Sequence, residues 1–234
     1  MQYAIIAAGE GSRLCHEGIA APKPLVKVGG ECLIDRLVRI FAAHGSTAIS
    51  VVCRPDKLVE SHVEALKRCY PMLRYVVRST PSSMHSFLEL TPLLEADEPF
   101  VLTTVDTVFD EREFADYMVA FVQALTNGYD GLMGVTDYVD DERPLYVSTN
   151  ESMDILSFHD SCNHPRYISA GIYGLTPRAL STLSQCAERG EQRMRNFQRA
   201  LLADGLRLKS WAFGRVYDID HAADIVKAEQ YLQR

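Results

Sequence analysis

The chain has 234 residues, enough for one substantial domain with its own core. Its net charge of −7, from 31 acidic and 24 basic residues, argues against a general nucleic-acid-binding surface, although local cations can still bind a nucleotide. None of the 6 cysteines forms a Cys-x-x-Cys pair, which disfavours a zinc site. No apolar run is long enough to span a membrane, so we expect a cytoplasmic protein without membrane insertion.

Apolar runs that suit buried strands alternate with amphipathic segments in the first part of the chain, about residues 1–136. The expected strands span residues 3–8, 49–53, 73–77, 100–105 and 131–135. The expected helices span residues 31–43, 86–94 and 111–125, and another follows Asp56, which can cap it. This alternation predicts an α/β fold with a mostly parallel sheet and helices on both of its faces.

The pattern changes in the second part of the chain, about residues 137–234, where the strand-like pieces are shorter. The expected strands are 145–148, 155–159, 167–175, 206–212 and 216–219, and the expected helices are 177–187, 194–203 and 222–232. The first three of these strands predict a small antiparallel lobe laid on one edge of the sheet. We expect residues 1–234 to form a single domain.

A glycine-rich loop with one arginine follows the first expected strand, and a lysine comes a short distance later. Glycine has no Cβ, so backbone N–H groups at such a loop can approach phosphate oxygens closely. An arginine can bind two phosphate oxygens at once, and a lysine adds a point charge. The loop therefore predicts a cradle for a triphosphate. The residues expected to contact it are Ala8, Gly9, Gly11, Ser12, Arg13 and Lys23.

Two common phosphate-binding loops are excluded by the residues present. A Walker A loop requires Gly-Lys followed by Ser or Thr, and the dinucleotide fingerprint requires a third glycine where this chain has Leu14. We expect the chain to remain irregular through Gly18 and the next helix to begin only near Glu31. The phosphates would then meet a long loop with two cations, not a helix N-terminus.

The segments 7–14 and 22–25 together resemble the signature of the nucleotidyltransferase superfamily, which includes sugar-1-phosphate nucleotidyltransferases and phosphocholine cytidylyltransferases. Residues 105–107, 169–173 and 216–220 are similar to later landmarks of that superfamily, in the same order. The resemblance implies a three-layer, Rossmann-like fold of the GT-A type. It also implies transfer of a nucleotide from a nucleoside triphosphate to a sugar 1-phosphate, phosphocholine or a similar phosphate, with release of pyrophosphate.

Two aspartates, Asp106 and Asp218, each follow an apolar strand, at the edge where open α/β sheets bind ligands. One or two carboxylates usually hold Mg²⁺ together with substrate oxygens and water. We therefore predict a site for Mg²⁺ or Mn²⁺, with Asp106 catalytic together with Arg13 and Lys23. The resemblance favours Asp218 as the second ligand. Asp220 alternates with Asp218 across the pleat, so it would either support the metal or cap the last helix.

The resemblance implies that the segment after the third strand contacts the base and ribose, here through Ser82 and Ser86. This segment lacks the Gly-Thr-Ala-like stretch of sugar nucleotidyltransferases. It is closer to the pattern of phosphocholine cytidylyltransferases, which favours CTP as the nucleotide. The alternative interpretation is a simple helix cap at Ser82 or Ser83.

We expect cations from the second part of the chain, about residues 137–234, to bind the acceptor phosphate. Many sugar enzymes of the superfamily have a Glu-Lys step where this chain has Ser157, Phe158 and His159, with no lysine. The candidate replacements are Arg143, His159, Arg166 and Arg195.

An acceptor phosphate is already anionic, so its direct attack on the α-phosphate needs no general base. Three other functions stay open. They are a guanylyl- or cytidylyltransferase of cofactor biosynthesis, a non-catalytic nucleotide-binding regulatory module, and a metal-dependent glycosyltransferase. The missing acceptor lysine favours the second, whereas the third would normally carry two aspartates near Asp106. The expected partners are small molecules, with no nucleic acid, and the resemblance makes a homo-oligomer possible.

Overall fold

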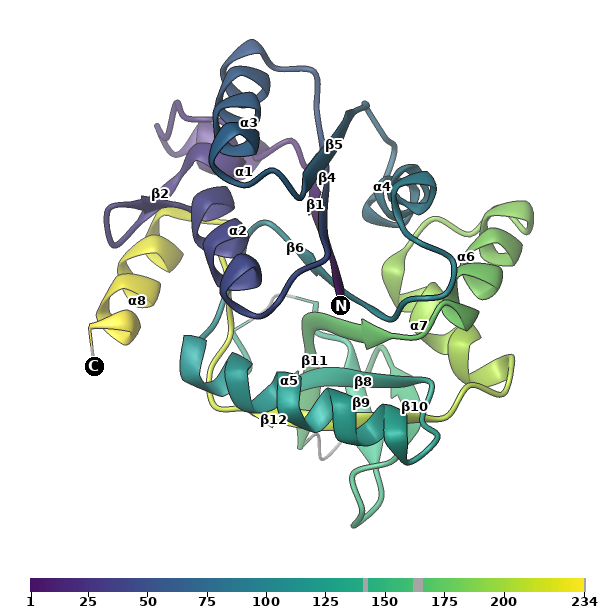
Figure 1. The fold of residues 1–234 in the computed structure, drawn as a ribbon. Helices are drawn as coiled ribbons and strands as arrows, with labels where there is room; N and C mark the ends of the chain where they lie inside the picture. Colours follow the sequence, from purple (N-terminus) through teal and green to yellow (C-terminus); the bar gives the residue numbers. More distant parts are fainter. Residues whose placement is uncertain (141–142, 162–165, 234) are drawn as a thin grey trace.

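The computed structural model describes residues 1–140, 143–161 and 166–233, and Cys162 lies outside the described residues. Its main element is one nine-stranded mixed sheet (Figure 1). The first five strands in spatial order are β5 (Leu73–Val77), β4 (Ala48–Cys53), β1 (Gln2–Ala7), β6 (Phe100–Thr104) and β11 (Tyr167–Leu175). The others are β8 (Gly131–Thr136), β12 (Leu208–Phe213), β9 (Tyr146–Thr149) and β10 (Ile155–His159). The first four strands run parallel, as the alternation predicted.

The antiparallel strand β11 lies inside the sheet, not on its edge as we expected. Along one edge it pairs with β9 near its start and with β6 near its end, and along the other edge it pairs with β8, antiparallel to all three. Most of its residues are buried, and a strand covered on both faces belongs in the interior of a sheet. The small lobe of β9 and β10 therefore extends from a central strand, while β12 adds to β8 in parallel.

Helices cover both faces of the sheet, which confirms the three-layer prediction. One layer holds α2 (Leu33–Ala43), α3 (Lys57–Cys69), α5 (Glu111–Thr126) and α8 (Ala222–Leu232), and the other holds α4 (Ser83–Leu90), α6 (Arg178–Glu188) and α7 (Met194–Ala203). Strand β1 serves both cores because its side chains alternate in direction. Tyr3 and Ile5 pack with the first layer, whereas Ala4 and Ile6 pack with the second. Among the described residues, no helix is both long and apolar enough to cross a bilayer.

The segment between β1 and α2 contains more structure than the sequence suggested. It holds the short helix α1 (Ser12–His16), a 3-10 turn at Lys23–Leu25 and a small hairpin of β2 (Lys27–Val28) and β3 (Glu31–Cys32). The expectation of no helix before residue 31 was therefore wrong. Gly11, at φ +62°, turns the chain into α1, and a helix of 5 residues is too short to produce a periodic pattern.

The remaining short elements are the 3-10 turn Thr91–Leu93 and the two-stranded sheet of β7 (Thr107–Val108) and β13 (Tyr217–Asp218). This small sheet joins two segments that are 111 residues apart in the chain and that both carry predicted site residues.

An ion-pair network joins α2 to the start of α5. Glu111 accepts hydrogen bonds at 2.9 Å from both Arg36, which is nearly buried, and Arg39. The hydrogen bonds from Arg39, followed by the interactions with Arg36, hold the pKa of Glu111 below its usual range. Partial burial acts in the opposite direction but is outweighed. A carboxylate with a lowered pKa stabilises the fold above its unfolded pKa, and this stabilisation disappears as the pH falls through the folded pKa.

We expect Glu111→Gln to lower the free energy of unfolding by about 1 kcal/mol at neutral pH, a modest value because the Glu111 side chain is 41% exposed. The difference from the wild type should shrink towards about pH 3, where Glu111 becomes protonated. Urea unfolding at several pH values measures this, with Glu188→Gln on an exposed stretch of α6 as the control. A difference that stays constant with pH would contradict the assigned role of the charge.

Candidate functional site

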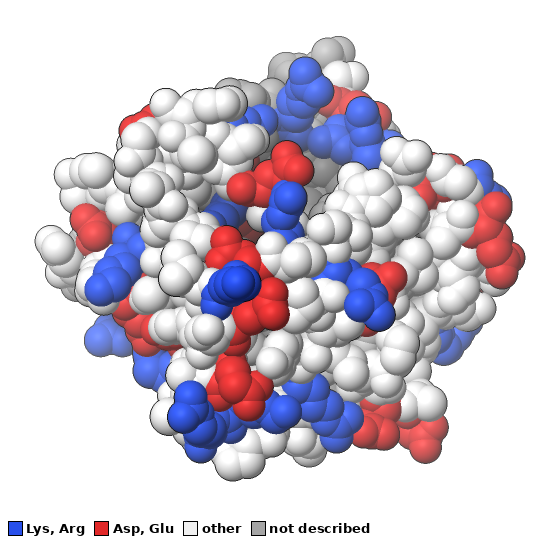
Figure 2. Space-filling model, turned by 90° about the horizontal axis from the view of Figure 1, so that it is seen from above, with Lys and Arg blue, Asp and Glu red and all other residues white. Residues whose placement is uncertain are grey.

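A cleft opens where β1 and β6 end, which is the edge of a parallel sheet that binds ligands in open α/β folds. Figure 2 shows charged side chains of both signs around a hollow in this face of the molecule. The residues that line the cleft are Ile6, Ala8, Gly9, Glu10, Gly11, Ser12, Arg13, Lys23, Ser83, Ser86, Thr104, Val105, Asp106 and Asp220. Of the residues predicted to bind the nucleotide or the metal, the structure brings together in this lining all except Ser82 and Asp218. We call this hollow the glycine-loop cleft.

Lys23 stands at the centre of the glycine-loop cleft, between two carboxylates. Its side chain is only 8% exposed; its Nζ forms an ion pair with Asp106 and donates to Asp220 Oδ1 at 2.6 Å. Arg13 binds the other oxygen of Asp220 at 2.7 Å. Burial alone would lower the pKa of Lys23, but the two carboxylates outweigh it and raise this pKa. Lys23 is therefore a fixed cation within the site.

Gly11 makes this placement of Lys23 possible. A Cβ at Gly11 would lie 3.1 Å from the Cβ of Lys23, and the φ of +62° is one that other residues rarely adopt. The glycine of the loop is thus needed for its close approach to the lysine, as well as for any approach to a ligand.

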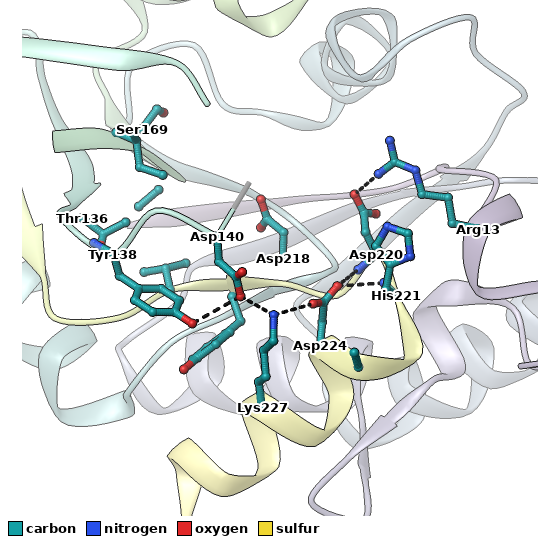
Figure 3. A pocket seen from close by; sticks show the side chains of 15 residues that line it. Arg13, Thr136, Tyr138, Asp140, Ser169, Asp218, Asp220, His221, Asp224 and Lys227 are labelled. Carbon is teal, nitrogen blue, oxygen red and sulfur yellow. Dashed lines mark hydrogen bonds and ion pairs between the residues drawn. The ribbon is translucent and has the colours of Figure 1, made fainter. Parts of the chain in front are cut away.

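Asp220 does not cap the last helix, so that alternative was wrong. His221 is the N-cap of α8, and it forms a capping box with Asp224. Asp220 instead forms ion pairs with Lys23 and with Arg13, and Figure 3 shows the second of these. Burial would raise its pKa, but these two cations outweigh burial and hold the pKa of Asp220 below its usual range.

Asp218, the residue favoured by the resemblance, has a different environment. It pairs with Thr107 in the β13–β7 sheet, and its Oδ1 accepts a hydrogen bond from the Thr107 hydroxyl at 3.4 Å. The backbone N–H of Ile219 donates to the carbonyl of Asp106 at 3.1 Å, which fixes the two acidic segments side by side. Asp106 and Asp220 are the pair that share Lys23, while Asp218 lies along the neighbouring wall.

The Asp106 carboxylate fits a divalent cation. Its Oδ1 is buried and has no hydrogen-bond partner among the described residues, so an oxygen lone pair is left for another ligand. Carboxylate oxygens are the ligands that hard cations such as Mg²⁺ and Mn²⁺ prefer. Asp220 offers a second carboxylate from the same cleft.

Beside the glycine-loop cleft lies a second one, which we call the arginine cleft. The residues that line it are Ser82, Ser83, Thr104, Arg143, Leu145, Ser169, Gly171, Tyr173, Gln192, Arg193, Met194, Arg195, Gln198 and Asp218. The lining contains three arginines and one aspartate, so this cleft suits an anion. Arg195 is anchored, because it donates to the carbonyl of Arg143 at 2.9 Å and pairs with Asp160.

Two of the predicted acceptor cations do not line the arginine cleft. His159 Nε2 contacts the hydroxyl of Ser157 at 2.7 Å, and the Arg166 guanidinium lies 5.0 Å from the centre of the Tyr167 ring. Arg193, at the N-cap of α7, lines the cleft but was missed, because an exposed arginine before a helix carries no distinct sequence signal.

A third hollow, on the other side of Asp218 and Asp220, is rich in carboxylates (Figure 3). Lys227 binds Asp140 at 2.6 Å and lies 3.6 Å from Asp224, and the Tyr138 hydroxyl also donates to Asp140. With four aspartates against Arg13 and Lys227, this hollow is less suited to a phosphate than the arginine cleft.

The serines after β5 have structural partners. Ser82 is the N-cap of α4, and its hydroxyl accepts from the His85 N–H at 3.4 Å, as the alternative interpretation expected. The Ser86 hydroxyl is 2.6 Å from that of Thr80 and 3.2 Å from the Ser82 carbonyl. Ser83, which the sequence suggested only as a helix cap, is the residue of this segment that lines both clefts.

Comparison with known proteins identifies the family of this chain. Residues 3–204 match the family model of the MobA-like NTP transferase domain. The chain belongs to this family. The match confirms the resemblance drawn from the glycine-rich loop, and the three-layer architecture agrees with it.

The MobA-like chain also resembles individual proteins over different extents. It is 34% identical over 53 residues, 23% of this chain and 21% of the relative, to the glucose-1-phosphate cytidylyltransferase of Salmonella typhimurium. It is 22% identical to the bifunctional protein GlmU of Methanococcus maripaludis over 99% of this chain and 54% of that protein. The matches thus span from about a fifth to about half of the length of these curated relatives.

Solved structures share the fold of the MobA-like chain. The inositol-1-phosphate CTP transferase from T. maritima superposes with a TM-score of 0.77 and 18% identity, covering 100% of this chain and 96% of that one. The CTP:phosphocholine cytidylyltransferase from Streptococcus pneumoniae gives 0.77 and 17%, covering 99% and 98%. At these identities the likeness establishes the fold.

Proposed function

We propose that the protein is a nucleotidyltransferase that uses Mg²⁺ or Mn²⁺ to transfer a nucleotide from a nucleoside triphosphate to a phosphorylated small molecule. The observation that carries the proposal is the arrangement of Arg13 and Lys23 beside Asp106 and Asp220 in the glycine-loop cleft. Cations for a triphosphate and carboxylates for a divalent cation meet there. The adjoining arginine cleft supplies a place for a second anion.

In the proposed reaction, an acceptor phosphate oxygen forms a bond to the α-phosphorus of the nucleotide. The bond between that phosphorus and the oxygen bridging to the β-phosphate breaks, and pyrophosphate leaves with the electron pair. Arg13 and Lys23 counter the charge of the triphosphate, and the loop glycines admit its oxygens. The attacking oxygen is anionic, so no side chain has to remove a proton.

The divalent cation would be held by Asp106 and Asp220, with Asp218 nearby in the lining of the arginine cleft. When bound, it would neutralise charge on the phosphate oxygens. Asp106 supports this role because one of its oxygens has no hydrogen-bond partner among the described residues.

We further propose CTP as the nucleotide. The names of the compared proteins from Salmonella typhimurium, T. maritima and Streptococcus pneumoniae all refer to CTP or cytidylyl transfer. The base would lie near α4, where Ser83 at the first position of the helix lines both clefts, as Thr104 at the end of β6 also does. The hydroxyls of Ser82 and Ser86 are bonded within the first turn of α4. These two residues would therefore assist nucleotide binding through their backbone and by stabilising that turn.

For the acceptor, the arginine cleft favours a sugar or polyol phosphate over phosphocholine. The exposed Gln192 offers an amide that suits hydroxyl groups, whereas choline carries a cation that the arginines of the lining would repel. Aromatic faces bind such a cation, and Tyr173 supplies the single aromatic ring in this lining of described residues.

The test is pyrophosphate release with Mg²⁺, with each of the four nucleoside triphosphates against sugar 1-phosphates, inositol 1-phosphate, phosphocholine and aminoalkyl phosphonates. Turnover with CTP and a sugar or polyol phosphate supports the full proposal. Turnover with another pair retains the reaction and rejects the substrate assignment. Nucleotide binding by thermal shift without turnover across the panel favours the non-catalytic alternative.

Arg193→Gln should raise the KM for the acceptor by roughly 10-fold and leave the KM for the nucleotide unchanged, because the side chain lines the arginine cleft alone. Steady-state kinetics with the pair found above measures both constants. Arg68→Gln, on an exposed part of α3, is the control. An equal effect on both KM values would place Arg193 outside the acceptor subsite.

A further inference from the structure

A cluster of three metal-binding side chains lies away from the clefts, between α2 and α3. Cys32 is the N-cap of α2, Asp35 is in the first turn of the same helix, and His62 comes from the middle of α3. Their sulfur, carboxylate oxygen and imidazole nitrogen atoms all lie within 4.8 Å of one another. His62 Nε2 is 2.5 Å from Asp35 Oδ1. We call these residues the Cys-Asp-His cluster.

We propose that the Cys-Asp-His cluster binds one Zn²⁺. A thiolate with an imidazole and a carboxylate is a donor set that zinc prefers, whereas Mg²⁺ takes oxygen ligands almost exclusively. The ionised thiol and carboxylate carry two negative charges, which balance the charge of the ion. Cys32 is buried while Asp35 and His62 are half-buried, so the ion would have a protein wall behind it and water in its fourth position.

The backbone explains how the cluster forms. Cys32 and Asp35 are three residues apart, so they lie on one face of the start of α2. The depression in front of them is lined by the hairpin residues Lys27, Gly29, Gly30 and Glu31 and by Leu25, in addition to the cluster itself. Gly29 and Gly30 both have positive φ, and neither carries a side chain over the depression.

An ordinary structural contact explains only part of this arrangement. The bond between Asp35 and His62 already links α2 to α3, and it needs no thiol. Cys32 within reach of both donors is the additional feature that a metal site requires. The expectation that zinc was disfavoured rested on the absence of paired cysteines, and it did not consider ligands from two helices, such as Asp35 and His62, which are 27 residues apart.

The zinc site would be separate from the glycine-loop and arginine clefts, since no described residue of the cluster lines either. Leu25, however, belongs to the 3-10 turn that begins with Lys23. A bound ion would therefore fasten the start of α2 to α3 beside the turn that positions this lysine.

The test is a titration of metal-stripped protein with Zn²⁺ against a chromogenic chelator, in excess Mg²⁺. We expect one ion per chain, and an affinity lowered roughly 10–100-fold or more by Cys32→Ser and by His62→Gln. Cys69→Ser, an exposed thiol on α3, should bind as the wild type does. Asp106→Asn should also leave Zn²⁺ binding unchanged, which separates this site from the proposed catalytic metal.

Co²⁺ gives a second readout, because a thiolate ligand produces a charge-transfer band in the near ultraviolet. The band should appear in the wild type and in Cys69→Ser and be absent from Cys32→Ser. His62→Gln covers the case in which the buried Cys32 variant fails to fold. Unchanged Zn²⁺ affinity in a folded Cys32 or His62 variant, or loss of binding only in Asp106→Asn, would overturn the proposal.

Discussion

Asp106→Asn is expected to lower kcat by roughly 10²–10³-fold or more while the protein stays folded. The change keeps the shape of the side chain but removes the charge that faces Lys23 and the buried oxygen without a hydrogen-bond partner among the described residues. An amide cannot replace a carboxylate as a ligand of a divalent cation at equal strength. The measurement is pyrophosphate release at saturating substrates, with circular dichroism to verify the fold.

The matched control is Asp97→Asn, an exposed aspartate in the loop before β6, which should retain full activity. The structure also leads to different expected effects for Asp218 and Asp220. Asp220→Asn should approach the defect of Asp106→Asn because Asp220 shares Lys23, whereas Asp218→Asn should lose less. Near-normal turnover in Asp106→Asn would refute the metal assignment, and a larger loss in Asp218→Asn would return the second ligand to that residue.

The sequence predicts this fold well where periodicity is long. Strands Leu73–Val77, Ile155–His159 and Tyr167–Leu175 and helices Met194–Ala203 and Ala222–Leu232 have the expected bounds. Asp56 caps α3 as predicted, through hydrogen bonds from Leu58 and Val59. Such elements depend on local patterning and capping, which one sequence displays directly.

The place of β11 in the sheet was not readable from the same pattern. Its length and burial were visible as an apolar run, but its neighbours depend on which strands its two edges meet. Pairing between distant segments leaves no local signal. The same reason explains why α1, only 5 residues long and defined by Gly11, was missed.

The sequence likewise identified some residues of the candidate site but could not decide between others. Arg13, Lys23 and Asp106 could be selected because each follows a strand or a glycine-rich loop in a recognisable order. The choice between Asp218 and Asp220 depends on which side chain meets Lys23, 197 residues from Asp220. Pleat alternation could not separate the two aspartates, because β13 ends at Asp218 and both side chains line the hollow of Figure 3, so the second ligand could be assigned only in three dimensions.

Lys23→Met is expected to lower kcat/KM by roughly 10²–10³-fold and also to change how the protein responds to Mg²⁺. Methionine has a similar length but no charge, so Asp106 and Asp220 lose the cation that now lies between them. Without added metal we expect a loss of about 2 kcal/mol in stability, less than for a fully buried pair because Asp220 is 41% exposed.

A divalent cation can take the place of the missing ammonium group, so Mg²⁺ should raise the Tm of Lys23→Met more than that of the wild type. In the wild type the same ion must compete with Lys23 for both carboxylates. Thermal unfolding across a Mg²⁺ titration tests this, with the exposed Lys57→Met as the control that should follow the wild type. If Mg²⁺ shifts the Tm of all three proteins equally, the ion does not bind between Asp106 and Asp220. In that case, the carboxylates serve to hold Lys23 in place for the triphosphate.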